Sequence, residues 1–365
     1  MNKQYIYLWL AGVFLLSACS DEMGAGLKSK PQALGRTNEI VVIADEDAWE
    51  ATLRDTFTFY FESAYPIMPR PEPMFDVRHF TPRDLAAESL RKELRTYVVL
   101  ADLSNKDSKA TELVRTDLGE ERYQEALKTE KFTTTVGKDK WARGQLIVYI
   151  MGRNMDELHD LVKTNYPAVA QRINKHDEDQ LRAGIYGLGD NPGLGREISE
   201  KFGFNVQLPA KYRVAISRDD PDFMWLRKND REENAMNIIL SKKKYVSQDQ
   251  LSVEAIKEWR NALGEYVTSS EEGSKMVIND RDLPIYDYTH SIDGKFTKEV
   301  RGIWEMTGDF LGGPFSTYIY LDEKAGEIFM LDAFIYAPGK NKRNMMQQLD
   351  YIAKHVTFPA SAIDQ

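Results

Sequence analysis

The pattern of apolar and polar positions divides the chain into a short apolar opening, a polar stretch and a long body of alternating elements. The opening run, residues 5–16 (YIYLWLAGVFLL), has 12 residues and follows the positively charged Lys3. A membrane-spanning helix needs about 20 apolar residues, whereas the apolar region of a secretory signal has roughly 7–15. The pattern therefore predicts a signal peptide over residues 1–18.

The four residues that end this run, Leu16-Ser17-Ala18-Cys19, have the pattern of a lipobox. Small side chains at 17 and 18 let an extended backbone enter a narrow protease cleft, and the thiol of Cys19 is the nucleophile that would carry a diacylglycerol. Two or three acyl chains give stable membrane attachment. We predict that Cys19 is lipidated; the alternative is an ordinary signal peptide with a chance cysteine.

A polar stretch over residues 19–38 follows and reads as the lipidated cysteine with a flexible linker, rich in Gly, Lys, Ser and Pro. It opens with Ser20-Asp21-Glu22. These residues resemble an acidic tag that sends lipoproteins to the outer face of the outer membrane. A solvated polar tether is the other interpretation, so the membrane face stays open.

The first half of the body, residues 39–186, alternates β-branched apolar runs with amphipathic stretches, which predicts an α/β unit. Asp45 stands where it can cap the helix that directly follows it. Pro167 should break the last helix. The expected strands are 39–44, 74–80, 97–101, 132–136 and 145–151, and the expected helices are 46–63, 83–95, 109–128 and 155–186.

Residues 187–203 read as a glycine-rich linker with a short helix, because 187–195 (GLGDNPGLG) cannot continue a regular helix. The second half, residues 204–365, predicts an α+β unit: an antiparallel sheet covered by helices at 252–267 and 342–356. Its expected strands are 212–217, 223–227, 237–240, 275–278, 286–290, 298–306, 316–321 and 327–336. The fold class is thus α/β and α+β, in two sheet-plus-helix units.

Two short segments of the body resemble each other. Residues 148–154 (VYIMGRN) and 335–341 (IYAPGKN) both read strand, Tyr, Gly, basic residue, Asn, helix. Generic strand-to-helix chemistry explains this, since Gly allows a left-handed turn and Asn caps a helix. Two duplicated units are the other explanation.

Composition and charge narrow the partners. The chain is 42% hydrophobic, enough for a core, and its net charge of −9 disfavours nucleic acid, whose phosphates repel an acidic surface. The single cysteine excludes a disulfide within the chain.

No motif in the sequence assigns a catalytic residue, a metal site or a cofactor. No two of the five histidines have the i, i+4 spacing that brings metal ligands together on a helix. The glycines of residues 187–195 follow a helical pattern and lack the Lys-Ser/Thr of a phosphate loop. Sequence alone cannot pair two carboxylates across a cleft.

Two tryptophans lie in aromatic strand segments, Trp225 in residues 222–227 and Trp304 in residues 302–306. Packing in the core is the default interpretation for such residues. A platform on which a sugar or peptide stacks is the functional interpretation, and it requires an exposed ring.

One resemblance covers nearly the whole body. Phe202-Gly203-Phe204, Leu208-Pro209, Tyr212-Arg213-Val214, Phe223–Arg227 and Tyr336–Arg343, together with the lipobox, resemble the Bacteroidetes lipoproteins that carry the domain of unknown function 4837. The resemblance implies a location and no chemistry. The element order of the second half also resembles the Mog1/PsbP type of α/β sandwich, whose members are mostly accessory binding proteins.

These observations favour a lipid-anchored outer-membrane protein that acts by binding. Its partners would be the membrane, through the N-terminal lipid, and an envelope protein or a glycan. Two alternatives stay open. One is an envelope hydrolase of glycan or peptide that uses a carboxylate pair beside Trp225 or Trp304, and the other is a structural subunit of an envelope complex.

Overall fold

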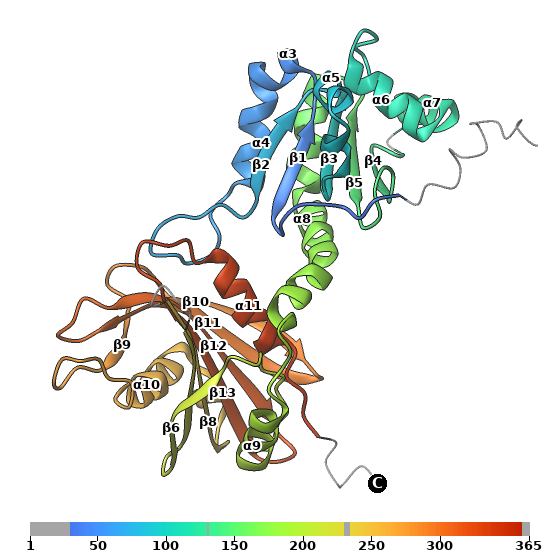
Figure 1. Cartoon of the computed structure of the whole chain (residues 1–365). Coiled ribbons are helices and arrows are strands. Elements are labelled where there is room, and N and C mark those ends of the chain that lie inside the picture. Colours follow the sequence, from blue (N-terminus) through green and yellow to red (C-terminus); the bar gives the residue numbers. More distant parts are fainter. Residues whose placement is uncertain (1–29, 130, 230–233, 360–365) are drawn as a thin grey trace, which may run out of the picture. The chain divides into compact units, whose positions relative to one another are not determined.

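The computed structural model describes residues 30–129, 131–229 and 234–359, which form two compact units (Figure 1). The first unit contains Val77–Asn165 and the residues up to Arg54; the second contains Asp55–Asp76 and the residues from Tyr166 onward. The signal peptide, the lipobox with Cys19 and the acidic residues 20–22 lie outside the described residues.

The first unit is built on a five-stranded mixed sheet in the order β2-β1-β3-β5-β4. Strands β1, β3 and β5 are parallel, and β4 is antiparallel to β5. Every residue of β1 and β5 is buried, as continuous apolar runs in parallel sheets require. The strands are β1 (Glu39–Ile43), β2 (Asp76–Phe80), β3 (Thr96–Asp102), β4 (Thr134–Lys138) and β5 (Leu146–Gly152).

The helices of this unit are more interrupted than the sequence predicts. The expected helix 46–63 contains a π-helical turn, and the expected helix 109–128 is broken at Gly119, whose φ of 82° no α-helix accepts. The elements are α3 (Glu46–Ala48), η1 (Trp49–Leu53), α5 (Pro82–Ala87), η2 (Ser89–Glu93), α6 (Lys109–Leu118) and α7 (Glu120–Lys128). Helix α4 (Arg54–Phe61), which continues η1, belongs to the second unit except for Arg54.

Helix α8 (Met155–Tyr186) is continuous, so the break expected at Pro167 is wrong. A proline removes one backbone hydrogen bond, but this helix also buries Leu158, Val162 and Ile173 along its length. Its start agrees with the expected cap, because the Glu157 N–H donates to Asn154 Oδ1 at 2.9 Å.

The second unit is built on an eight-stranded antiparallel sheet in the order β10-β11-β12-β13-β8-β7-β6, with β9 paired to β11. This confirms the predicted fold class of two sheet-plus-helix units. The strands are β6 (Arg213–Asp219), β7 (Asp222–Asn229), β8 (Ala235–Lys244), β9 (Met276–Asn279), β10 (Tyr286–Ile292), β11 (Lys295–Met306), β12 (Gly312–Asp322) and β13 (Glu327–Tyr336).

Helices cover both faces of this sheet. Alternate residues of a strand point to opposite faces, so Leu331 packs in the core under α9 (Pro192–Phe202) and α11 (Arg343–Lys354). Its neighbour Met330 packs in the core under α10 (Val253–Gly264), which follows the short helix η3 (Gln248–Leu251). Burying one such side chain contributes about 1.5–3 kcal/mol.

The expected linker, residues 187–203, is largely helix α9, and this helix buries Leu194, Ile198 and Phe202 in the second unit. Asn191 caps it by accepting a hydrogen bond from the Leu194 N–H, and the two glycines inside it, Gly193 and Gly195, do not prevent its first turn. Packing therefore assigns this helix to the second unit, which already includes the residues from Tyr166 onward.

The two segments that resemble each other do lead from a strand into a helix, β5 into α8 and β13 into α11. Their sheets differ, since β5 has a parallel and an antiparallel neighbour and β13 has two antiparallel ones. The difference favours generic strand-to-helix chemistry over duplication.

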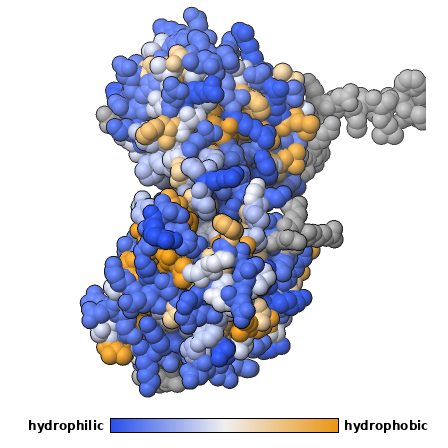
Figure 2. Space-filling model, turned by 90° about the vertical axis from the view of Figure 1, so that its left-hand side faces the viewer, coloured by the Kyte–Doolittle hydropathy of each residue, from blue (hydrophilic) through white to orange (hydrophobic). Residues whose placement is uncertain are grey.

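Figure 2 shows one face of the molecule, on which hydrophobic residues occur in small groups among hydrophilic ones. A search of the described residues finds no helix both long and apolar enough to cross a membrane.

Candidate functional site

The carboxyl edge of the first sheet holds a cavity of about 360 Å³. Its lining residues follow the ends of β1, β2 and β3, and β1 is followed along the chain by β2 on one side and later by β3 on the other. In open α/β sheets, ligands bind outside the carboxyl ends of strands at such a switch of direction. The lining residues are Asp45, Glu46, Asp47, Thr81, Pro82, Arg83, Asn105, Asp107, Ser108 and Lys109.

Asp45 fixes one wall of this cavity. Its carboxylate accepts hydrogen bonds from the Ser108 hydroxyl and from the backbone N–H groups of Lys109, at 3.0 Å, and Ala110, at 3.3 Å. Asp45 therefore caps the distant helix α6, and no side-chain bond joins it to the helix that follows it, which corrects the expectation. The contact joins the end of β1 to the start of α6 and places a negative charge at the positive end of the α6 dipole.

Thr81 fixes the opposite wall through a capping box at the start of α5. The Asp84 N–H donates to Thr81 Oγ1 at 3.0 Å, and the Thr81 N–H donates to Asp84 Oδ2 at 3.0 Å. These hydrogen bonds from Thr81 lower the pKa of the Asp84 carboxyl. The side chains of Asp47, Arg83 and Asp107 stay exposed at the rim. Hydrogen bonds therefore fix two walls of the cavity, and its rim is polar.

The lining carries four carboxylates and two cationic side chains, together with two hydroxyls and one amide. One carboxylate, Asp45, already binds a helix terminus, and Lys109 pairs with Glu112 at 2.7 Å. Such a set suits hydroxyl and amino groups better than a phosphate or another anion, because the free charge at the rim is mainly negative.

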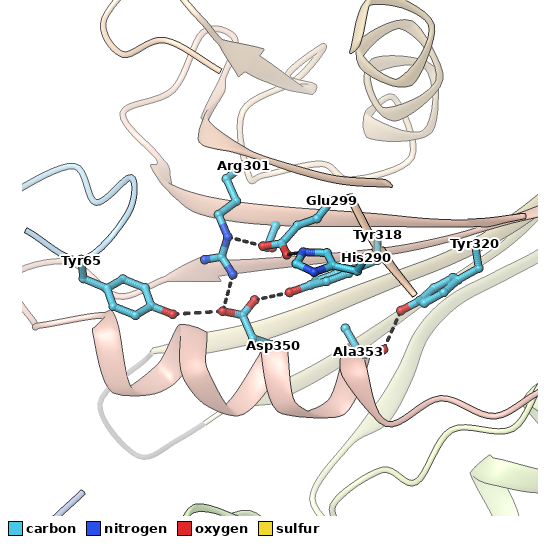
Figure 3. A network of polar contacts seen from close by, with 9 residues as sticks. Tyr65, His290, Glu299, Arg301, Tyr318, Tyr320, Asp350 and Ala353 are labelled. Carbon is cyan, nitrogen blue, oxygen red and sulfur yellow. Dashed lines mark hydrogen bonds and ion pairs between the residues drawn. The ribbon is translucent and has the colours of Figure 1, made fainter. Parts of the chain in front are cut away.

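A second polar cluster lies inside the second unit, between the sheet and α11 (Figure 3). Arg301 on β11 pairs with Asp350 on α11, with 2.6 Å between Nη2 and Oδ2. The Arg301 Nε–H donates to Glu299, whose other carboxylate oxygen lies 2.5 Å from His290 Nε2. Glu299 is 2% exposed, so this row of charges runs through the interior of the fold.

Tyrosine hydroxyls complete the cluster around Asp350. The Tyr65 hydroxyl donates to Asp350 Oδ2 at 3.0 Å, and the Tyr318 hydroxyl donates to Oδ1 at 2.9 Å. Burial by itself would raise the pKa of Asp350. The charges of Arg301 and Lys354 and the hydrogen bonds from Arg301 and Tyr318 outweigh it, and the pKa lies below its ordinary value. A carboxylate held in this way is an anchor for the helix.

The opposite face of the sheet has its own buried pair. Arg260 on α10 donates from Nε to Asp332 Oδ1 of β13 at 2.8 Å, and both side chains are at most 1% exposed. The Thr317 hydroxyl donates to the same oxygen at 2.6 Å, and the Arg260 guanidinium lies 4.0 Å from the Phe315 ring centre. One Arg–Asp pair therefore ties a helix to each face of the sheet.

The two tryptophans lie in the core. Trp225 is 8% exposed and its Nε1–H donates to Asn237 Oδ1 at 3.1 Å, while Trp304 is 4% exposed and donates to the Ile335 carbonyl at 3.2 Å. Neither ring exposes a face on which a ligand could stack, so the condition of the stacking hypothesis is not met.

Sequence reasoning did not single out Tyr65, Arg301 and Asp350, because they lie far apart in the chain. The signal that comes nearest is an acid inside an otherwise apolar helical stripe, and Asp350 is such a residue. Among the described residues, no group of three or more His, Cys, Asp or Glu side chains is placed to hold a metal ion.

Comparison with solved structures gives low scores. The expected likeness to the Mog1/PsbP type is found, and it is weak. The cyanobacterial PsbP (CyanoP) of Synechocystis sp. PCC 6803 has 11% identity and a TM-score of 0.29, over 43% of this chain and 86% of that one. A variant of the protein Mog1 has 8% identity and a TM-score of 0.28, over 45% and 94%. LpqN of Mycobacterium tuberculosis, involved in cell envelope biogenesis, has 12% and 0.25, over 43% and 83%.

Family models match both halves. No curated protein matches the chain. Residues 33–185 match the domain of unknown function DUF8532, and residues 193–355 match the domain of unknown function DUF4837. The match to DUF4837, expected over nearly the whole body, is confined to the second half, because a different family model matches the first. The chain therefore joins a segment that matches DUF8532 to a segment that matches DUF4837.

Proposed function

We propose that the protein is a lipid-anchored protein of the cell envelope that acts by binding a small polar ligand in the cavity of its first unit. The observation that carries the proposal is the position of that cavity, at the switch of direction between β1 and β3. Its volume of about 360 Å³ falls within the range of ligand sites in proteins.

The ligand chemistry follows from the lining. Carboxylates accept hydrogen bonds, and the Thr81 and Ser108 hydroxyls and the Asn105 amide can both donate and accept them. We assign the cavity to a ligand with several hydroxyl or amino groups, such as a saccharide, an amino sugar or an exposed part of an envelope glycan.

The location is proposed from residues 16–19. Lipid on Cys19 would hold the body at the outer membrane, and Ser20-Asp21-Glu22 would decide whether it faces the periplasm or the cell surface.

The binding test is a cavity-filling substitution. Asn105→Trp should fill the cavity, whereas Lys106→Trp, at the exposed neighbouring position outside the lining, should leave it open. Thermal stabilisation of the purified protein is measured with a panel of monosaccharides, amino sugars and amino acids. The proposal expects stabilisation of the parent and of Lys106→Trp by the same compounds, and none of Asn105→Trp. A panel that stabilises none of the three proteins, or all three equally, refutes it.

The anchoring test is membrane fractionation of Cys19→Ala with protease treatment of intact cells. If the parent fractionates with membranes and is released by detergent while Cys19→Ala is not found in the membrane fraction, lipidation is supported. Unchanged membrane attachment of Cys19→Ala refutes it. Digestion of the anchored body while a periplasmic marker survives identifies the surface-facing side.

A further inference from the structure

Strand β10 ends the eight-stranded sheet without the features that normally protect an edge. Exposed edges invite pairing with another strand, and proteins block this with bulges, prolines or exposed charges. β10 contains no proline, and all seven of its residues pair in unbroken register with β11. Its single charged residue, Asp287, is ion-paired with Lys298 of its own sheet.

The other edge of the sheet, β6, is protected. The register between β6 and β7 shifts between Val214 and Ile216, which marks a β-bulge. β6 also carries Arg213, Arg218 and Asp219 as exposed residues. Within one sheet, one edge is therefore blocked and the other is open to a further strand.

The hairpin that joins β10 to β11 shows which backbone groups point outward. Asp293 and Gly294 form its two-residue turn, with φ values of 48° and 72° that are typical of a type I′ turn. Such a turn closes on a hydrogen-bonded pair, here Ile292 with Lys295, and every second pair along the ladder repeats that pattern. Asp287, Thr289 and Ser291 therefore direct their N–H and C=O groups toward the open edge.

Strand β10 carries two exposed aromatic side chains, and contacts with β11 hold this part of the strand in place. Tyr286 and Tyr288 are 47% and 40% exposed. They stand opposite Arg301 and Glu299 on β11, on the same face as the buried charge cluster. Because Glu299 also contacts His290, the cluster fixes this part of the strand in place.

We propose that β10 is the interface through which two copies of this chain pair, antiparallel and about a two-fold axis at Thr289. Two-fold dimers are the commonest symmetric assembly, and an antiparallel pair of identical edges has that symmetry. The pairing uses the outward groups of Asp287, Thr289 and Ser291 and continues the sheet from one copy into the other.

The nearly neutral charge of β10 favours pairing with a second copy of this chain over pairing with a strongly charged partner. The strand has one charge, which Lys298 neutralises. In the proposed register Asp287 faces Ser291 of the second copy, Tyr288 faces His290, and Thr289 faces Thr289, so no like charges stand opposite each other.

The test uses single introduced cysteines in the full chain, which has one native cysteine, Cys19. In Thr289→Cys the two new Cα atoms would lie about 5.5 Å apart, within the range of a disulfide. In Asp287→Cys, position 287 of one copy faces position 291 of the other, four residues away from the second introduced cysteine. The two new Cα atoms would then lie about 14 Å apart, which a disulfide cannot span. Ser217→Cys on exposed β6 reports random collision.

The expected result on mild oxidation of membranes is a covalent dimer in Thr289→Cys and monomer in Asp287→Cys, Ser217→Cys and the parent. Co-expression of Asp287→Cys with Ser291→Cys should restore the cross-link. Monomer in Thr289→Cys overturns the proposal, as does equal cross-linking at positions 289, 287 and 217.

Discussion

Arg301 and Asp350 form an ion pair of 2.6 Å between β11 and α11, and their side chains are 7% and 9% exposed. The pair does not stand alone, because Glu299 contacts Arg301 and the hydroxyls of Tyr65 and Tyr318 contact Asp350. Tyr65 comes from Asp55–Asp76, which belongs to the second unit although it precedes most of the first in the chain. The cluster therefore ties a remote segment, a helix and a strand together.

Removing one partner of this pair should be costly. Asp350→Ala leaves Arg301 buried without its main counter-charge, and the loss of one partner of a buried pair typically costs about 3–5 kcal/mol. Urea unfolding of the two proteins measures it.

The matched control replaces both partners. Arg301→Met with Asp350→Leu removes both charges and should recover much of the stability lost in Asp350→Ala, since well-packed apolar replacements of buried pairs are often neutral. A double variant no more stable than Asp350→Ala would show that the groups left without partners dominate: Glu299, which loses Arg301, and the two tyrosine hydroxyls, which lose Asp350.

Acid should weaken the same contact. The pKa of Asp350 is lower in the folded chain than its ordinary value, so folding favours the charged form. Its contribution is complete above the unfolded pKa of about 4 and is lost as the pH falls through the lower folded pKa. Unfolding free energy measured from pH 6 downward should fall less steeply in Asp350→Asn than in the parent. Equal slopes would contradict this assignment.

Local patterns predict most elements of this fold and little of its interior chemistry. The strand at 39–44 and most strands of the second sheet follow from apolar runs between turn residues, and this information is contained in a few neighbouring positions. The break predicted at Pro167 failed because burial along α8 offsets one lost hydrogen bond. Elements whose packing outweighs their local preference are the ones that pattern alone misplaces.

The sequence does not show which groups its isolated polar side chains contact in the fold. Asp45 has the composition of a local cap, yet it caps α6, whose first residues are more than 60 positions away. Glu72 does the same for α11, accepting from the N–H groups of Lys342 and Arg343 at 2.6 and 2.8 Å. Capping chemistry is readable in a sequence, and the choice of helix depends on tertiary structure.

Alkali should unfold the protein as buried tyrosines ionise. Burial is the main cause that raises the pKa of Tyr65, Tyr318 and Tyr320 above the ordinary value. Their stabilising contribution is complete below the unfolded pKa of about 10 and is lost as the pH rises from there through the folded values. Phenolate absorbance and far-ultraviolet circular dichroism, followed together above pH 10, should change in one shared transition for these buried groups. Full ionisation of every tyrosine while the dichroism stays native would contradict their burial.

Two helical glycines should respond oppositely to the same substitution. A Cβ on Gly264, the last residue of α10, would overlap the carbonyl oxygen of Met276 on β9, whereas a Cβ on Gly184 in α8 meets none of the described atoms within 4 Å. Gly264→Ala must push α10 away from the sheet and should cost about 2 kcal/mol or more, the range of overpacked cores. Gly184→Ala should gain about 0.5–1 kcal/mol, because alanine loses less backbone entropy in a helix. Thermal unfolding of both variants measures the difference. A Gly264→Ala protein as stable as the parent would show that α10 can move away from Met276 on β9 without loss of stability.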